Sequence, residues 1–366
     1  MTSKATQIGI SGSYSRDDCI FLLKELDLEL LSVDEKEKRL QAGVHYSEMV
    51  SIENPPSAEY TRLFLKMLDK YKQRLAQEIA ALAAHIHQHY AQQQITLLSL
   101  ARAGTPIGIL LHRTLKYKFL RDSQHYSISI IRDKGLDTAA IRHVLQQNRS
   151  PSSILFVDGW TAKGVITREL KQSVADWNKA NPEQLNDTLC VISDIGGTAD
   201  IVATSDDYVI PSGIMNSTVS GLVSRTVRTR HATADQFHGC MIYHHLASVD
   251  YSNLFIDQIY ELINTTQPNN LPHYDKTLQH QQAQAYVQYL QKHYEILDIN
   301  KIKPGIAEAT RVMLRRIPRL LLLKNLHLED IQHLKILAQE KNIPIHVDPN
   351  MPFNATALIK ELEGEG

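Results

Sequence analysis

The chain has 366 residues, of which 43% are hydrophobic, so it is long enough for two domains, each with a sizeable core. Its formal net charge of −1 excludes a bulk attraction to nucleic acid or to an acidic membrane. The three cysteines, Cys19, Cys190 and Cys240, lack CxxC spacing, which argues against a disulfide framework and a structural zinc site. The N-terminus lacks an apolar signal-peptide core, and no run approaches the roughly 18 apolar residues of a membrane span. We therefore expect a soluble, cytoplasmic protein with no membrane partner.

The first 90 residues are predicted to end in a long helical region. Residues 20–31 fit a strand or a short helix, and residues 45–60, which carry a Pro-Pro pair, are expected to be irregular. Four polar residues at 45–48 make that stretch either a surface arm or an active-site flap. From Tyr60 to Tyr90 the apolar residues recur at helical spacing and predict one long helix or two. The histidines at 85, 87 and 89 would spread over different helix faces, so no metal site is expected there.

Two strand–loop–helix units follow. A strand at 95–100 leads through Arg102 and Gly104 into a helix that starts near Pro106. A strand at 154–157 ends in Asp158, and a tight loop at 159–164 precedes a helix from Val165. At the carboxyl edge of a parallel sheet, such loops bind phosphate through backbone N–H groups, and the carboxylate binds ribose hydroxyls or Mg²⁺. The alternative is two ordinary turns, with Arg102 in solvent and Asp158 only capping its loop.

Further strands and helices alternate around these units. Residues 125–145 read as a strand, a break at 132–135, and a helix from about Thr138; Arg132 and Lys134 would neutralise an anionic substrate or belong to a solvated hairpin turn. Asp194 ends a strand within 187–197, a strand is predicted at 208–210, and a hydroxyl-rich helix start within 211–227. The alternation from 95 to 210 predicts an α/β fold with a doubly wound, mostly parallel sheet.

We predict a main domain at 1–264, a linker and bridging helix at 265–299, and a small α/β/α domain at 300–366. The linker follows a helix at 252–263 and contains two prolines, and the bridging helix spans about 278–297. The last domain is expected to alternate α-β-α-β-α and to end in a helix at 354–362. Residues 300–325 hold seven basic residues and one acid, Glu308, which fits contact with RNA phosphates. The alternative is a helix face that pairs with the neighbouring domain.

Four motifs resemble one known family. ARAGTPIG, HYSISIIRDKG, VDGWTAKG and SGIMNSTVSGLVSRTV are similar to the StiP family, phosphoribosyltransferase-like proteins of bacterial tellurium-resistance and stress gene clusters. KPGIAEATR, at 303–311, resembles the Pelota-type RNA-binding domain. The resemblance implies a phosphoribosyltransferase-type sheet that binds phosphoribosyl diphosphate (PRPP) with Mg²⁺ at Asp158 and Asp194, a C-terminal domain that binds RNA, and a possible homodimer.

The resemblance also assigns roles to individual residues. Asp158 would contact ribose hydroxyls, Asp194 would be a second catalytic carboxylate, and Arg132 and Lys134 would lie in a mobile hood over the site. The ribose-phosphate loop would comprise Gly159, Trp160, Thr161, Ala162, Lys163 and Gly164. The diphosphate loop would comprise Arg102, Ala103, Gly104 and Thr105. The RNA-binding residues would be Lys303, Gly305, Glu308, Arg311, Arg315 and Arg316.

Three functions are open at this stage. The first, which we expect, is a PRPP-dependent glycosyltransferase that ribosylates a base or a related nucleophile. It would make a nucleoside-like metabolite in a stress or tellurium-resistance pathway. The second is a non-catalytic nucleotide or ribose-phosphate sensor coupled to RNA binding, which Gly159 favours because related enzymes carry a second acid there. The third is a cysteine protease, because proteins of the StiP family are also named cysteine proteases. Such an enzyme needs a thiolate activated by a nearby histidine. Cys240 comes nearest to that pattern, because His238 and His244 lie close in sequence.

Overall fold

A parallel sheet forms the centre of the molecule. The computed structural model describes residues 8–90, 94–228, 233, 235–316 and 318–360. Within these residues, six strands pair in parallel in the order β1-β6-β5-β9-β10-β11. They span Ile20–Phe21 (β1), Gln94–Leu100 (β5), Asp122–Ile128 (β6), Ile154–Thr161 (β9), Leu189–Asp194 (β10) and Ile201–Thr204 (β11). The predicted α/β fold with a mostly parallel sheet is confirmed.

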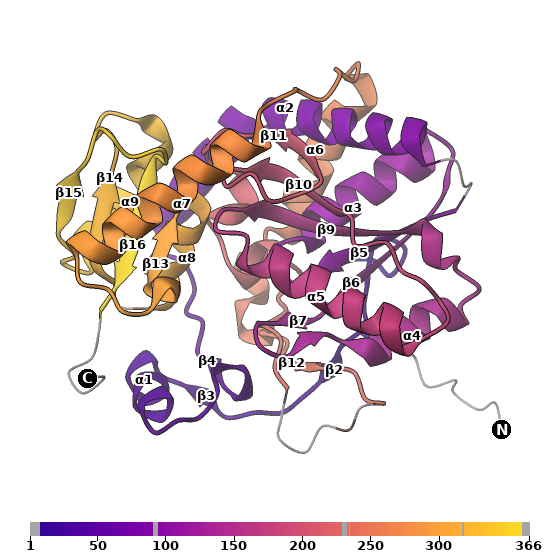
Figure 1. The fold of residues 1–366 in the computed structure, drawn as a ribbon, viewed down its shortest axis with the longest axis horizontal. Coiled ribbons are helices and arrows are strands. Elements are labelled where there is room, and N and C mark those ends of the chain that lie inside the picture. Colours follow the sequence, from indigo (N-terminus) through magenta and orange to yellow (C-terminus); the bar gives the residue numbers. More distant parts are fainter. Residues whose placement is uncertain (1–7, 91–93, 229–232, 234, 317, 361–366) are drawn as a thin grey trace.

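Helices cover both faces of this sheet (Figure 1). One face carries α2 (Ala58–His89), α3 (Thr105–Arg113) and α6 (Ser252–Thr265), and the other carries α4 (Thr138–Gln146) and α5 (Val165–Ala180). The strands are apolar on both sides: Leu97 packs toward α2 and α3, and its neighbour Leu98 packs toward α4 and α5. Strands buried on two faces read as continuous hydrophobic runs, which is why the sequence identified β5, β9 and β10.

The long helical region is a single helix. Ser57 caps α2 by accepting a hydrogen bond from the N–H of Tyr60 at 3.1 Å. Near its end, His85 stacks on His89 and His87 stacks on Phe119. Among the described residues, no group of three or more His, Cys, Asp or Glu side chains is placed to hold a metal ion. In the same part of the chain, no helix is both long and apolar enough to cross a membrane.

Several predicted elements of the main domain differ from the structure. β9 continues past Asp158 to Thr161, because Trp160 and Thr161 pair with β10, so the loop before α5 is shorter than predicted. Residues 208–210 are not a strand: this apolar run packs as buried chain beneath α2, and the missed edge strand is β11. Residues 211–227 contain two short 3₁₀ turns, Pro211–Gly213 and Ser217–Val219, in place of an α-helix.

Short elements surround the large sheet. The strand pairs are β2 (Lys24–Glu25) with β12 (Gly239–Cys240), β3 (Leu30–Leu31) with β4 (Val50–Ser51), and β7 (Ile130–Ile131) with β8 (Gly135–Leu136). Helix α1 spans Val33–Gln41. The remaining single turns are Tyr46–Glu48, Thr114–Lys118, Pro151–Ser153, His244–Val249, Ile299–Lys301 and Glu329–Ile331. The segment at 20–31 is therefore three short strands, and the segment at 45–60 is irregular apart from one turn and β4.

A second sheet forms the C-terminal part. Its strands are β13 (Ile302–Pro304), β14 (Pro318–Leu323), β15 (Ile345–Val347) and β16 (Ala355–Ile359), in the order β13-β16-β14-β15. Helices α8 (Ile306–Arg315) and α9 (Gln332–Glu340) cover one face, and α7 (Lys276–His293) covers the other. The predicted final helix at 354–362 is wrong over 355–359, which form β16. That strand lies between β13 and β14 and is buried on both faces, so its apolar run has no polar side to mark it as a strand.

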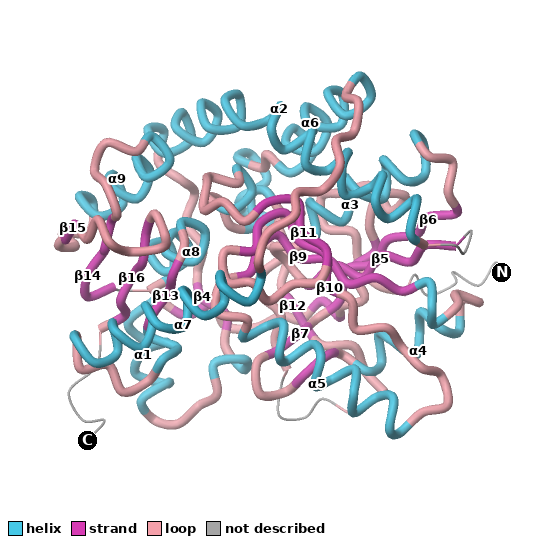
Figure 2. Tube along the Cα trace, turned by 45° about the horizontal axis from the view of Figure 1, so that its top comes forward, coloured by secondary structure: helices cyan, strands magenta, loops and turns pink. Residues whose placement is uncertain are grey.

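The C-terminal sheet lies against the carboxyl edge of the central sheet (Figure 1). Asp207, which follows β11, accepts hydrogen bonds from the backbone N–H groups of Ile306 at 2.8 Å and Asn354 at 2.7 Å. On the outer side, α9 lies near one end of α2 (Figure 2). Lys70 of α2 contacts Glu329 beside α9 at 2.5 Å. The N-terminus of α8 is therefore held over the ends of β9 and β10.

Candidate functional site

The two predicted strand–loop–helix units, which contain β5 and β9, meet α8 at the carboxyl ends of these strands. We call this region the junction site, and it contains Glu53, Arg102, Asp158, Trp160, Lys163, Arg225, Lys303, Glu308, Arg311 and Arg315. The main domain supplies the first six of these residues, and β13 and α8 supply the rest. All are partly exposed except Arg102, which is buried. The site is therefore assembled from two parts of the chain and still reaches solvent.

The central contact of the junction site joins Trp160 to α8. The indole N–H of Trp160 donates to Glu308 Oε1 at 3.1 Å, and the guanidinium of Arg311 lies 5.0 Å from the indole ring. Arg311 Nη1 is 3.4 Å from the same carboxylate oxygen. Burial opposes ionisation of Glu308, but Arg311 and Lys303 outweigh it and lower the pKa of this carboxyl. Glu308 thus serves as a structural acceptor between β9 and α8.

Asp158 and Lys163 lie in surroundings that disfavour their charges. Burial raises the pKa of Asp158 to about 7, although Arg311 and the N–H of Gly159 favour the carboxylate. Lys163 donates to the carbonyls of Ile299 and Ile302 at 2.6 and 2.7 Å, and so ties the loop after β9 to β13. Burial and the nearby Lys303 lower the pKa of Lys163 to about 7. An acid and a base thus titrate near neutral pH at one site, a feature common among functional sites.

A second group of charges surrounds Glu53. Arg102 donates to the carbonyl of Val223 at 2.7 Å and lies 3.3 Å from Glu53, which also accepts from the backbone and hydroxyl of Ser217. Burial opposes ionisation of Glu53, but Arg102 and Arg315 outweigh it and lower its pKa. From the other domain, Arg315 donates to Asn216 Oδ1 at 2.8 Å. Glu53 therefore pairs with Arg102 and lies near enough to Arg315 of α8 for that charge to favour its carboxylate.

Positive charge exceeds negative charge at the junction site. The six basic residues named above face three acids, one of which, Asp158, is readily protonated. Burial and the neighbouring arginines lower the pKa of Arg315 well below its usual value, and burial lowers that of Arg225 to about 10. The guanidinium of Arg225 lies 4.5 Å from the Tyr46 ring, and that of Arg132 lies 5.1 Å from the same ring. Such an excess of partly buried cations is suited to an anionic ligand.

Other predicted site residues have structural contacts that explain them. A Cβ on Gly104 would lie 2.4 Å from the Val157 carbonyl, so this glycine allows close packing of α3 on β9, and its φ of −72° needs no special conformation. Thr105 bonds to Ser127 inside the core, while Ala103 lies between Gly104 and Arg102. Asp194 is buried and accepts three backbone N–H bonds within the loop after β10.

The rest of the predicted ribose-phosphate loop packs against the loop that follows β10. Thr161 bonds to Thr198 at 3.0 Å, and a Cβ on Gly164 would touch the Thr198 side chain. Ala162 is buried, and its carbonyl would overlap a Cβ on Gly196, while Gly159 lies inside β9. The requirement for small residues here therefore follows from the packing of two adjacent loops. Mg²⁺ at Asp158 and Asp194 stays a prediction.

The predicted hood is the β7–β8 hairpin. Arg132 pairs with the adjacent Asp133 at 3.1 Å, and Lys134 is exposed at the turn. The N–H of Asp133 donates to Glu169 of α5 at 3.0 Å, so the hairpin rests on α5. In the C-terminal part, Gly305 has a φ of +88° at the start of α8, where a Cβ would lie 2.5 Å from Ile195. Arg316, the C-cap of α8, is partly exposed.

The three thiols are buried. Cys19, Cys190 and Cys240 each have no exposed surface. Burial raises the pKa of all three thiols, that of Cys240 to about 12. Cys240 pairs in register with Glu25, whose carboxylate lies 3.7 Å from His244 Nε2. His238 bonds instead to Ser129 at 2.8 Å.

Sequence reasoning missed several residues of the junction site. Glu53 and Arg225 are absent from the predicted site residues, as is Asn216, which accepts from Arg315, because each lies in an irregular segment without a strand–loop–helix pattern. The sequence offered two signals for these residues. Glu53 is an acid just before the Pro-Pro pair, and Arg225 is a basic residue near the end of the hydroxyl-rich run at 211–227.

Comparisons with known proteins give a family for both parts of the chain. Residues 12–260 match a family described as tellurite-like stress resistance cysteine protease StiP, and residues 281–361 match the PELOTA RNA binding domain. A curated protein of Acinetobacter baylyi (strain ATCC 33305 / BD413 / ADP1), named cysteine protease StiP, is 41% identical over 99% of this chain and 98% of its own length. The resemblances to StiP and to a Pelota-type domain are thus confirmed.

Solved structures are only slightly similar. The hypoxanthine phosphoribosyltransferase of Trypanosoma cruzi gives a TM-score of 0.29 at 14% identity, over 38% of this chain and 82% of its own. An amino transferase from Eubacterium rectale gives 0.23 at 8% identity, over 73% and 77%. Likenesses of this size carry no argument about function.

The expected PRPP-dependent glycosyltransferase is wrong. The family and the curated relative are both named for a cysteine protease, and the similarity to phosphoribosyltransferases is too slight to support the transferase. Motif spacing misled the prediction because strand–loop–helix units with small residues also occur where two loops simply pack together, as they do around Thr198.

Proposed function

This chain belongs to the StiP family, and we propose that its function is to bind a phosphate-bearing ligand at the junction site and RNA through its C-terminal domain. The observation that carries the proposal is the convergence of six basic side chains from both domains on three acids. Guanidinium groups suit phosphate because they present planar, paired donors. The match of residues 281–361 to an RNA-binding domain supports the second half of the proposal.

Trp160 offers a direct measurement of ligand binding. Its indole contacts Glu308 and Arg311, so an anion that draws Arg311 away should change its fluorescence. We would titrate the full chain with adenosine triphosphate and with a short single-stranded RNA. We expect saturable changes that are absent in Trp160→Phe and that weaken as salt rises.

Arg311→Ala tests the contribution of the junction arginines. If Arg311 neutralises one RNA phosphate, the plot of log K against log salt should become shallower by about 0.7 in this variant. Arg62→Ala, which removes an exposed arginine of α2, is the matched control and should leave the slope unchanged. Equal slopes in both variants would remove the junction site from RNA binding, and no titration by either ligand would overturn the proposal.

A cysteine protease is the second candidate, favoured by the family description and by the 41% identical relative of that name. Cys240 is the thiol to test first, because its register partner Glu25 lies beside His244. With its pKa near 12 and no exposed surface, this thiol would act only after β2 and β12 rearranged to expose it.

Peptide hydrolysis and thiol labelling separate this candidate from the first. Activity that is lost in Cys240→Ser and kept in Cys190→Ser, with iodoacetamide trapping only Cys240, would support it. Equal labelling of both variants without hydrolysis would eliminate it and leave ligand binding standing.

A further inference from the structure

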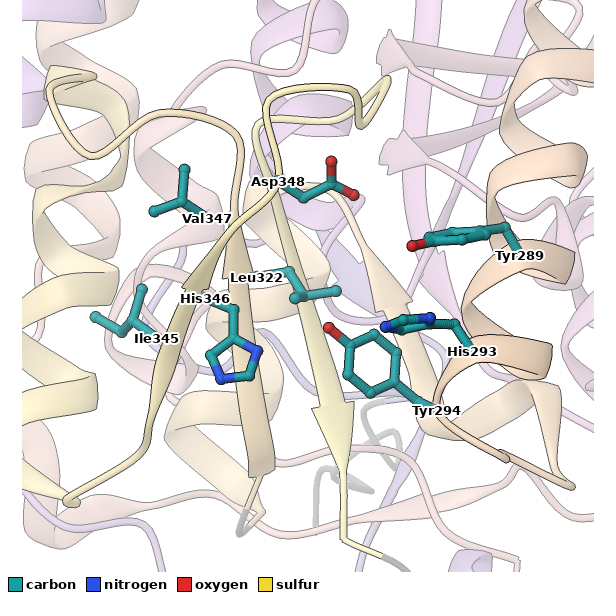
Figure 3. A pocket seen from close by; sticks show the side chains of 8 residues that line it. All are labelled: Tyr289, His293, Tyr294, Leu322, Ile345, His346, Val347 and Asp348. Carbon is teal, nitrogen blue, oxygen red and sulfur yellow. The ribbon is translucent and has the colours of Figure 1, made fainter.

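A hollow of about 550 Å³ opens on the C-terminal sheet (Figure 3). Its lining residues are all different from those of the junction site. It lies between the end of α7 and the edge strand β15, and we call it the aromatic groove. The residues that matter for its chemistry are Tyr289, His293, Tyr294, Leu322, His346 and Asp348. Its size falls within the range of small-molecule sites.

The groove exists because α7 covers only part of its sheet face. Tyr286, Val287 and Leu290 of α7 pack on residues of β14 and β16, including Leu322. His346 pairs in register with Leu322, so the two side chains share a face, but α7 does not extend over β15. His346 is therefore left exposed beside an apolar floor, with Tyr294 on the opposite side of Leu322 (Figure 3).

Aromatic rings form the wall on the α7 side. Tyr289 stacks on His293 with ring centroids 5.3 Å apart and an interplanar angle of 19°. His293 in turn meets the Tyr294 ring edge-on at 4.7 Å. Half of the Tyr289 surface is exposed, so part of this ring is accessible to a ligand. Flat rings arranged in this way are the usual platforms for unpaired nucleobases.

The polar groups at the groove complement a nucleotide. Arg319 donates to the Tyr294 carbonyl at 3.0 Å, and its guanidinium lies 5.7 Å from the Tyr294 ring, which places a cation next to the α7 side of the groove. Asp348 accepts a hydrogen bond from Tyr286 at 2.7 Å. A carboxylate has further lone pairs that can accept from the amino or imino groups of a base edge.

We propose that the aromatic groove binds unpaired nucleobases of single-stranded RNA. This inference rests on the proposed RNA binding and names a site for it. Of the basic residues that the sequence suggested for RNA, Lys303, Arg311 and Arg315 lie at the junction site, where Arg311 and Arg315 already contact Trp160 and Asn216. Arg319 instead contacts Tyr294 of the groove. All six groove residues lie within the segment that matches the RNA-binding domain. β15 is only three residues long, which makes the addition of a peptide strand at that edge less favourable.

The test is a titration of the full chain with a single-stranded RNA that carries 2-aminopurine. Stacking quenches this base, so saturable quenching is expected together with a rise in polarisation. Tyr289→Ala and His346→Ala, both at exposed positions, should bind about 5- to 100-fold more weakly and lose the quenching. Tyr289→Phe keeps the ring and should bind as the unchanged chain does.

Matched controls separate this inference from the proposed function. Tyr117→Ala removes an equally exposed tyrosine of the main domain and should change nothing. If RNA binds but Tyr289→Ala and His346→Ala bind it unchanged, the groove assignment is wrong while RNA binding stands. If the full chain binds no RNA, both fail. An extended peptide of alternating valine and threonine tests the other occupant. If the unchanged chain binds this peptide, His346→Ala does not, and both bind RNA equally well, the groove is a peptide site and the inference is overturned.

Discussion

At the scale of single residues, burial and charged partners compete at the junction site, and which of the two sets the pKa differs from one acid to the next. Asp158 has Arg311 nearby and a hydrogen bond from Gly159, yet its pKa rises to about 7 because burial removes water from the carboxylate. Glu308, with an arginine, a lysine and an indole N–H around it, has a lowered pKa. Two acids of one site are thus held in opposite states at acidic pH, which the sequence did not predict for either.

Asp158→Asn should change how stability depends on pH. Because the folded pKa lies above the ordinary value of 3.8, the folded chain binds this proton more tightly, so its contribution to stability falls as pH rises from about 4 to about 7. The variant lacks this loss and should gain roughly 1–3 kcal/mol relative to the unchanged chain between pH 5 and pH 8. Denaturant unfolding at the two pH values measures the difference.

Comparing Asp158→Asn with the unchanged chain separates the effect of Asp158 on stability from that of Lys163, because Lys163 titrates in the same range and is present in both proteins. Asp17→Asn, at an exposed position, is the control and should show no such gain. A gain that is equal at pH 5 and pH 8 would mean that Asp158 is already ionised at the lower pH.

At the scale of elements, the start of α8 depends on a conformation that only glycine adopts easily. Gly305 has a φ of +88°, and a Cβ there would lie 2.5 Å from the side chain of Ile195, the first residue of the loop that follows β10. The helix must turn sharply at this point because Ile306 donates its N–H to Asp207. A glycine in the sequence KPGIAEATR thus has a structural reason that is independent of RNA.

Gly305→Ala should destabilise the chain more than Gly43→Ala does. Both glycines have a positive φ, at +88° and +80°, so both variants carry backbone strain of roughly 1–3 kcal/mol. Only Gly305→Ala adds a steric overlap, which should cost a further 1–3 kcal/mol or so, since nothing lies within 4 Å of a Cβ on Gly43. Denaturant midpoints of the two variants decide, and equal midpoints would show that Ile195 moves aside freely.

The elements also show where sequence patterns suffice. β5, β9, β10 and the helices after them were predicted because buried parallel strands are apolar throughout and helices are amphipathic. β16 and the run at 208–210 were assigned wrongly, because a short apolar run has the same appearance in a strand, a helix and buried chain.

At the scale of the whole molecule, one carboxylate connects the two sheets. Asp207 accepts N–H bonds from Ile306 and Asn354, which belong to the C-terminal sheet and its first helix. Burial raises the pKa of Asp207 to about 6, against the effect of these donors. This contact fixes how α8 lies over β9, and with it the distance between Trp160 and Arg311.

Asp207→Ala should loosen the C-terminal domain. Each backbone N–H that loses its acceptor costs about 1–3 kcal/mol, so amide hydrogen exchange should speed up at Ile306 and Asn354. Asp206→Ala changes the neighbouring exposed acid, whose partner is Arg74 on α2, and should leave these amides protected. Equal exchange in both variants would show that docking does not depend on Asp207.

Local sequence was enough to determine the α/β class, most of the central strands, and the presence of two motif-bearing regions, because periodicity and turn chemistry act over a few residues. The tertiary structure alone decided what those motifs do. Trp160 and Glu308 are 148 residues apart and bond to each other, so the basic helix faces the neighbouring domain. Tertiary packing also buried all three thiols and left β15 uncovered beside α7. Burial and proximity between distant segments set pKa values and access to solvent, and these depend on the whole folded chain.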